Sequence, residues 1–196
     1  LMDEPLTVID LDLKFRLRRK LKEINQKYRS TLIYVTHDQN EAMTFAENII
    51  VMDQGNIVQA GTPSELFDRP KTTFVGYFIG APAMNLFACS AVNNTTISFG
   101  GAEIVTDTNL EAVTSKNLKL GIRSEYIKLA TASAENTVSA KVQRVEDLGN
   151  HKLVTADFQG QSIKVKVKRE QELPAENVFL TIPAQHCCVY ENEHLI

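Results

Sequence analysis

A chain of 196 residues, 43% of them hydrophobic, is long enough for one large domain or two small ones with a buried core. Its net charge of −3 makes nucleic acid an unexpected partner. No apolar run approaches the roughly 20 residues that a membrane-spanning helix needs, and the first residues lack the pattern of a secretory signal peptide. The three cysteines lack metal-ligand spacing and predict reduced core thiols in a cytoplasmic protein.

The first residues predict the end of an apolar strand followed by two carboxylates, Asp3 and Glu4. A second apolar segment, residues 31–36, predicts a buried strand that ends at His37. Carboxylates at a strand end can hold a metal ion and accept a proton from water. A histidine at the end of a neighbouring strand can contact the same phosphate. Taken singly, Asp-Glu-Pro is more often a turn or a helix cap, and a lone histidine is more often structural.

The other half of such a site would be a Gly-rich phosphate loop with its Lys, and these 196 residues contain none. The chain also starts at Leu1, inside the first expected strand. We therefore expect part of a nucleotide hydrolase, as a cut fragment that is inactive by itself.

A helix is expected between the two strands, with Asp10 or Asp12 as its N-cap. Its basic residues are interpreted as a solvated face. Its apolar residues recur at helical spacing and predict a buried stripe. The stripe consists of Leu13, Leu17, Leu21, Ile24 and Tyr28.

Further helices are expected over residues 39–46, 64–67 and 72–79. Residues 49–52 and 57–59 flank the turn sequence Asp-Gln-Gly-Asn and predict a hairpin.

The pattern changes near residues 80–82, after which short β-rich segments dominate. Many short strands separated by turn signals favour a small barrel or sandwich. The sequence therefore predicts an α/β region followed by an all-β domain, with Ile163, Val165 and Val167 on one buried face. The expected strands are residues 139–145, 153–158, 162–168, 178–182 and 186–190.

Several segments together resemble the second half of an ABC-transporter ATPase, and most closely the maltose-type, multiple-sugar import subfamily. The resemblance implies that residues 1–80 are the C-terminal part of a P-loop ATPase domain, and residues 81–196 an OB-like regulatory (TOBE) domain. The segments are Leu-Met-Asp-Glu-Pro-Leu at 1–6, Asp10, Val-Thr-His-Asp-Gln-Asn-Glu-Ala-Met at 35–43, residues 52–63, residues 74–85, Gly-Ile-Arg-Ser-Glu at 121–125 and Glu-Asp-Leu-Gly at 146–149.

The same resemblance implies roles for four residues. Asp3 would hold Mg²⁺, Glu4 would be the catalytic base, and His37 would sense the γ-phosphate of ATP. Asp10 would close a loop that crosses to a second ATPase subunit, although the family's Ser-x-Leu-Asp is Thr-Val-Ile-Asp here.

The implied partners are a second copy of the ATPase subunit, inner-membrane permease subunits and, indirectly, a solute-binding protein. The implied location is the cytoplasmic face of the membrane. Two other interpretations remain open: a regulatory and dimerisation module without catalysis, and an OB-like oligonucleotide-binding domain. Charge disfavours the second, because residues 81–196 contain 11 Lys and Arg against 13 Asp and Glu.

Overall fold

The computed structural model describes residues 1–174 and 176–196. The chain divides into two compact units, Leu1–Glu65 and Leu66–Ile196, and each is described by itself.

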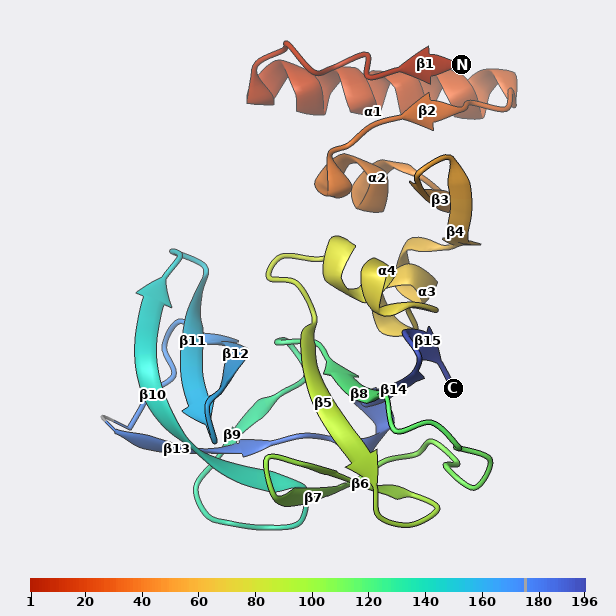
Figure 1. The fold of residues 1–196 in the computed structure, drawn as a ribbon. Helices are drawn as coiled ribbons and strands as arrows, with labels where there is room; N and C mark the ends of the chain where they lie inside the picture. Colours follow the sequence, from red (N-terminus) through yellow and green to blue (C-terminus); the bar gives the residue numbers. More distant parts are fainter. Residues whose placement is uncertain (175) are drawn as a thin grey trace. The chain divides into compact units, whose positions relative to one another are not determined.

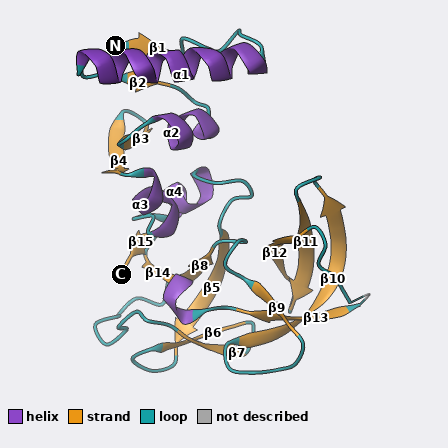
Figure 2. Cartoon of the chain, turned by 180° about the vertical axis from the view of Figure 1, so that it is seen from behind, coloured by secondary structure: helices purple, strands orange, loops and turns teal. Residues whose placement is uncertain are grey.

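The first unit begins with a strand, a helix and a second strand, in the expected order. Strands β1 (Met2–Asp3) and β2 (Tyr34–Val35) pair in parallel, with Asp3 opposite Val35. Helix α1 (Leu11–Tyr28) runs alongside both strands in the two views (Figure 1, Figure 2). The Asp10 side chain caps this helix by accepting the N–H of Leu13 at 3.0 Å. Because the strands are parallel neighbours, their carboxyl ends meet at one edge.

The prediction of a buried stripe on α1 is wrong for Leu13, Ile24 and Tyr28, which are exposed. The helix has 18 residues and is about 27 Å long, whereas β1 and β2 have two residues each and span roughly 7 Å. Periodicity gives the apolar face of a helix correctly, but the described sheet is too short to cover that face. The strand expected over residues 31–36 is likewise shorter than predicted, and Ile33 and Val35 are exposed.

The remainder of the first unit agrees with expectation. Asp38 caps α2, and Gln54 and Gly55 have the positive φ values of a tight hairpin turn between β3 and β4. In β3, Ile49 and Val51 are buried, and the residues that alternate with them are exposed. The elements are α2 (Gln39–Phe45), β3 (Ile49–Asp53), β4 (Asn56–Gly61) and, at the boundary of the two units, α3 (Pro63–Asp68).

The second unit is an all-β domain preceded by helix α4. Among the described residues its strands form a six-stranded sheet, β15-β14-β8-β5-β6-β7, and a five-stranded sheet, β12-β11-β10-β13-β9. The fold class expected from sequence, α/β followed by an all-β OB-like domain, is confirmed. The elements are α4 (Thr73–Phe78), β5 (Asn85–Ala91), β6 (Thr96–Phe99), β7 (Ala102–Val105), β8 (Leu118–Ile122), β9 (Lys128–Ala130), β10 (Thr137–Asp147), β11 (His151–Phe158), β12 (Gln161–Lys168), β13 (Asn177–Thr181), β14 (Cys188–Glu191) and β15 (His194–Leu195).

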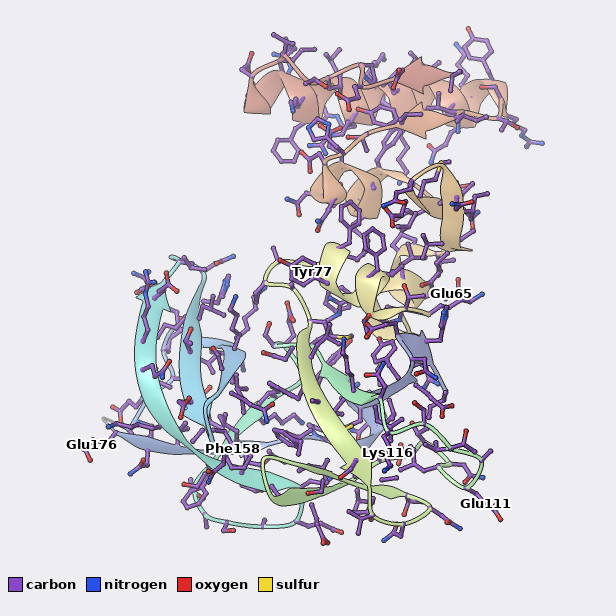
Figure 3. All side chains as sticks on the ribbon, viewed as in Figure 1. Glu65, Tyr77, Glu111, Lys116, Phe158 and Glu176 are labelled. Atoms are coloured by element: carbon purple, nitrogen blue, oxygen red, sulfur yellow. The ribbon has the colours of Figure 1, made fainter. Side chains whose placement is uncertain are left out.

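One hydrophobic cluster draws side chains from both sheets of this domain. Strand β10 bends across the five-stranded sheet (Figure 1), with a register shift between Val142 and Arg144. Phe158, at the end of β11 (Figure 3), packs edge-on against Phe99 with ring centroids 5.3 Å apart. The expected buried face of β12 is confirmed, because Ile163, Val165 and Val167 all lie in the cluster.

Helix α4 is attached to the sheets by the last residues of the chain. The backbone N–H of Thr73 donates to the carbonyl of Glu193 at 3.0 Å, and the N–H of Leu195 donates to the carbonyl of Lys71 at 2.9 Å. The Thr73 hydroxyl also donates to the Glu193 carboxylate. Residues 66–80 therefore belong to the same compact unit as the β-strands.

A buried arginine also fastens the helices to the sheets. Arg123, which follows β8, is 1% exposed. Its guanidinium donates to the carbonyls of Phe67 at 3.0 Å, of Gly76 at 2.8 Å and of Ile79, and it lies over the Phe67 ring, 4.4 Å from the centroid.

The cysteines are free and buried, as predicted. Burial raises the pKa of the Cys89 thiol to about 11 and that of Cys187 to about 12. These thiols stay protonated near neutral pH and act as core side chains.

Candidate functional site

Glu4 and His37 meet at the shared edge of the two parallel strands. The Nδ1 atom of His37 lies 2.8 Å from Oε1 of Glu4. Both side chains are open to solvent, with His37 71% exposed. The two residues are 33 positions apart in the sequence and are brought together by the parallel pairing of β1 with β2. The structure therefore brings together two of the four residues for which the resemblance implied a role.

The backbone places Glu4 at the point where the strand ladder ends. Its N–H donates to the carbonyl of Val35 at 2.9 Å, which continues the pairing of β1 with β2. Glu4 then adopts a φ of +42°, a left-handed conformation that turns the chain out of the strand. The Thr7 hydroxyl lies 3.0 Å from the Glu4 carbonyl oxygen and 3.2 Å from Oε2, so it supports the turn and orients the carboxylate.

The contact shifts the pKa values of the two groups in opposite directions. The hydrogen bond from His37 holds the pKa of the Glu4 carboxyl below its ordinary value. The same hydrogen bond raises the pKa of the His37 imidazole. Its stabilising contribution is therefore lost as pH rises through the raised pKa of His37, and also as pH falls through the lowered pKa of Glu4. Between these limits the pair is an imidazolium facing a carboxylate.

We expect His37 to titrate above the ordinary histidine pKa of about 6.5 in the folded chain. Replacing Glu4 by Gln should move its midpoint down, because an amide cannot stabilise the imidazolium by charge. A proton–carbon NMR titration of the imidazole signals measures both values. Glu23→Gln, on the exposed side of α1, is the matched control. An unchanged His37 midpoint in Glu4→Gln would contradict the pairing.

A second carboxylate, that of Glu41, lies beside the turn that follows β2 and carries His37. No role was assigned to it from the sequence. It is 4% exposed. Its Oε2 atom accepts hydrogen bonds from the hydroxyls of Tyr34 at 3.0 Å and Thr36 at 3.1 Å. Its Oε1 atom lies 3.4 Å from Nζ of Lys14. No local sequence signal marks this residue, because its burial depends on contacts with α1 and β2.

A small pocket lies beside these groups, lined in part by Thr7, Lys14, His37 and Glu41. Its volume of about 50 Å³ suits a few water molecules, whereas drug-sized ligands occupy roughly 300 Å³ or more. This pocket therefore offers room for water beside His37, but it does not enclose a nucleotide.

Asp3 and Asp10 are not drawn into the Glu4–His37 contact. Asp3 is exposed at the end of β1, and Asp10 uses its carboxylate to cap α1. Within the part of the chain that the structure describes, no three acidic, histidine or cysteine side chains cluster as a metal site. Mg²⁺ is commonly held by only one or two carboxylates together with substrate phosphates. Asp3 fits that limited role as a single protein ligand.

Residues 120–189, from β8 to β14, match the family model described as "TOBE domain". The chain is 35% identical over 190 residues to the sn-glycerol-3-phosphate import ATP-binding protein UgpC 2 of Agrobacterium fabrum, an alignment that covers 95% of this chain and 50% of that protein. UgpC of Salmonella typhimurium is 35% identical over 98% of this chain and 55% of its own length. UgpC of Vibrio vulnificus is 40% identical over 82% of this chain and 43% of its own length. The chain thus spans about half the length of the curated relatives it matches.

Among solved structures, the molybdate-binding protein ModG superimposes with a TM-score of 0.44 and 18% identity, over 57% of this chain and 96% of that chain. At that score the likeness supports no inference about a ligand. No helix among the described residues is both long and apolar enough to cross a membrane.

Proposed function

We propose that this chain, which is homologous to the C-terminal part of an ABC-importer ATP-binding protein and contains a TOBE domain, supplies the water-activating half of an ATP-hydrolysing site. The observation that carries the proposal is the 2.8 Å contact between Glu4 and His37 at the adjacent ends of parallel strands. A carboxylate and an imidazole so placed can act together on a water molecule and a phosphate.

In this proposal each of the four residues has a separate role. Glu4 accepts a proton from the attacking water, and its lowered pKa keeps it ionised near neutral pH. His37 holds the Glu4 carboxylate and orients the terminal phosphate. Asp3 would be a protein ligand of Mg²⁺, which when bound would neutralise phosphate charge. Asp10 fixes the start of α1, and so the loop before it, for contact with a second copy of the subunit.

The remaining machinery would come from outside these residues. A Gly-rich phosphate loop supplies backbone N–H groups and a Lys to the phosphates in such enzymes, and the sequence has none. The proposed assembly is a homodimer of ATP-binding subunits on the cytoplasmic face of the membrane, joined to permease subunits and served by a solute-binding protein. Residues 81–196 act as the regulatory domain.

The proposed solute is sn-glycerol 3-phosphate or a related phosphorylated polyol. The resemblance seen in the sequence implied import of sugars or a related solute, whereas the three relatives described above are named for sn-glycerol-3-phosphate import. The names of these relatives are the support for this choice.

The test is to replace the matched half of the Salmonella typhimurium protein by this chain. Such a chimera should hydrolyse ATP within about tenfold of the unmodified relative and should restore sn-glycerol-3-phosphate uptake to cells that lack their own copy. The chain alone should bind Mg-ATP more weakly than about 1 mM by calorimetry, because its pocket does not enclose a nucleotide.

The unmodified Salmonella protein is the positive control for both assays. A folded chimera that binds Mg-ATP without hydrolysing it would contradict the assignment of the water-activating half. Micromolar Mg-ATP binding by the chain alone would show that nucleotide affinity resides in these residues after all.

A further inference from the structure

Glu41 is the one acidic side chain that is buried among the described residues. A buried carboxylate is costly unless it is paired and hydrogen-bonded. This one is held by three elements: Tyr34 on β2, Thr36 in the following turn and Lys14 on α1. The Oε1 atom accepts no hydrogen bond from the described residues and faces the Lys14 ammonium at 3.4 Å. A buried ion pair contributes little net stability by itself. It does fix the positions of the two elements that it joins.

The hydroxyl of Thr36 connects Glu41 to the backbone on either side of His37. This hydroxyl donates to Glu41 at 3.1 Å and accepts the N–H of Asp38 at 3.0 Å. The Asp38 carboxylate in turn accepts the N–H groups of Asn40 at 2.9 Å and Glu41 at 3.2 Å, which caps α2. Both sequence neighbours of His37 are therefore fixed, while its imidazole is left to meet Glu4.

The same carboxylate connects the His37 turn to α1. Lys14 lies one turn into that helix, and its N–H donates to the carbonyl of Asp10 at 2.9 Å. The Lys14–Glu41 ion pair thus joins the helix that Asp10 caps to the turn that carries His37. Because of this ion pair, a displacement of the first turns of α1 would also displace the turn that carries the His37 imidazole.

We propose that Glu41, paired with Lys14, is a positioning residue that sets the orientation of His37 toward Glu4. The proposal rests on the proposed function for its catalytic consequence, but its structural part can be tested independently. The Tyr34 hydroxyl is a dependable donor to Glu41, because burial and then the hydrogen bond to Glu41 raise the pKa of Tyr34 to about 12. This hydroxyl therefore keeps its proton at neutral pH.

The structural test uses this chain and the imidazole nitrogen NMR signals of His37. Glu41→Leu removes the acceptor and should move these signals toward those of a histidine without a carboxylate partner. Glu41→Gln keeps an oxygen for Tyr34 and Thr36 but loses the ion pair with Lys14, and should move these signals less than Glu41→Leu does. Lys14→Met leaves an unpaired buried charge and should move them, and the double variant Lys14→Met/Glu41→Gln should restore them.

Lys20→Met and Glu23→Gln are the matched controls, because this pair lies on the same helix at 3.2 Å but is exposed. Neither should change the His37 signals. The circular dichroism and the melting transition of each variant show whether it is folded. His37 signals that stay unchanged in a folded Glu41→Leu chain, or a double variant that fails to restore them, would overturn the proposal.

The catalytic test uses the chimera with the Salmonella relative. Glu41→Leu should lower kcat by roughly 10- to 100-fold with little change in the KM for ATP, because misplacement of a reacting group by about 1 Å costs on that order. If His37 moves as expected but the unsubstituted chimera does not hydrolyse ATP, the proposed function fails and the positioning role stands. If the chimera is active and Glu41→Leu changes neither kcat nor His37, the positioning role fails and the proposed function stands.

Discussion

Replacing Arg123 by Met should lower the free energy of unfolding of the β-rich unit by about 3–5 kcal/mol. The guanidinium donates to the carbonyls of Phe67, Gly76 and Ile79, and all three would lose a charged donor. Hydrogen bonds to a charged group contribute about 1.5–3 kcal/mol each. The expected loss is smaller than three such contributions, because the substitution also removes the desolvation cost of the buried charge and the Nη2 atom that has no hydrogen-bond partner among the described residues. Met recovers part of the packing against the Phe67 ring but none of these bonds.

The measurement is a urea unfolding curve followed by a probe in the β-rich unit. Arg123→Lys should fall between the unsubstituted chain and Arg123→Met, since an ammonium keeps a charge but cannot reach three carbonyls in a fixed fork. Burial lowers the pKa of Arg123, yet a guanidinium stays protonated at any ordinary pH. The penalty should therefore hardly depend on pH between neutrality and mild alkali.

Arg144→Met is the matched control for this experiment. Its guanidinium pairs with Glu146 at 2.9 Å on an exposed part of β10, and such surface pairs contribute about 0–1 kcal/mol. Equal losses from the two substitutions would contradict the role assigned to Arg123.

Glu4→Gln should reduce ATP turnover of the chimera by about 10²- to 10⁴-fold, the usual contribution of a general base. Gln matches Glu in shape but cannot take a proton from water. Nucleotide binding should survive, because the phosphate contacts come from other residues in the proposed assembly. His37→Ala should also lower turnover, since it removes the partner that holds the Glu4 carboxylate at 2.8 Å.

Steady-state ATPase rates and retention of labelled ATP measure the two effects separately. Glu23→Gln, an exposed carboxylate on α1, should leave both unchanged. Turnover near the normal rate in both Glu4→Gln and His37→Ala would show that these roles are misassigned. Loss of ATP retention in Glu4→Gln would place Glu4 in nucleotide binding instead of proton transfer.

The sequence was sufficient to place Glu4 and His37 at the ends of neighbouring strands, but it did not predict that the two side chains contact each other directly. Two apolar segments separated by a helix favour parallel neighbours, and polar residues at their carboxyl ends then share one edge. The sequence was insufficient to predict how much of α1 is buried. An apolar periodicity shows which face of a helix can be buried, but not whether the neighbouring sheet is long enough to cover that face. Leu13 and Tyr28 are exposed for that reason.

Arg123 and Glu41 escaped prediction for a different physical reason. Charged residues are usually exposed, so their burial is decided by partners that are distant in the sequence or contributed by several elements. Arg123 finds its carbonyl partners 44 to 56 positions away, and Glu41 meets Lys14 from the preceding helix. Such arrangements follow from the tertiary structure and leave no local pattern.

The attachment of α4 to the last residues of the chain has a consequence for the order of folding. The contact between Thr73 and Glu193 closes a loop of 120 residues, as does the hydrogen bond from Tyr190 to Pro70. Closing so long a loop costs conformational entropy, and this entropy is lost before the contact contributes any stabilising free energy. On the ribosome, Thr73 would leave the exit tunnel 120 residues before Glu193, so α4 cannot dock until the segment that carries β15 is synthesised.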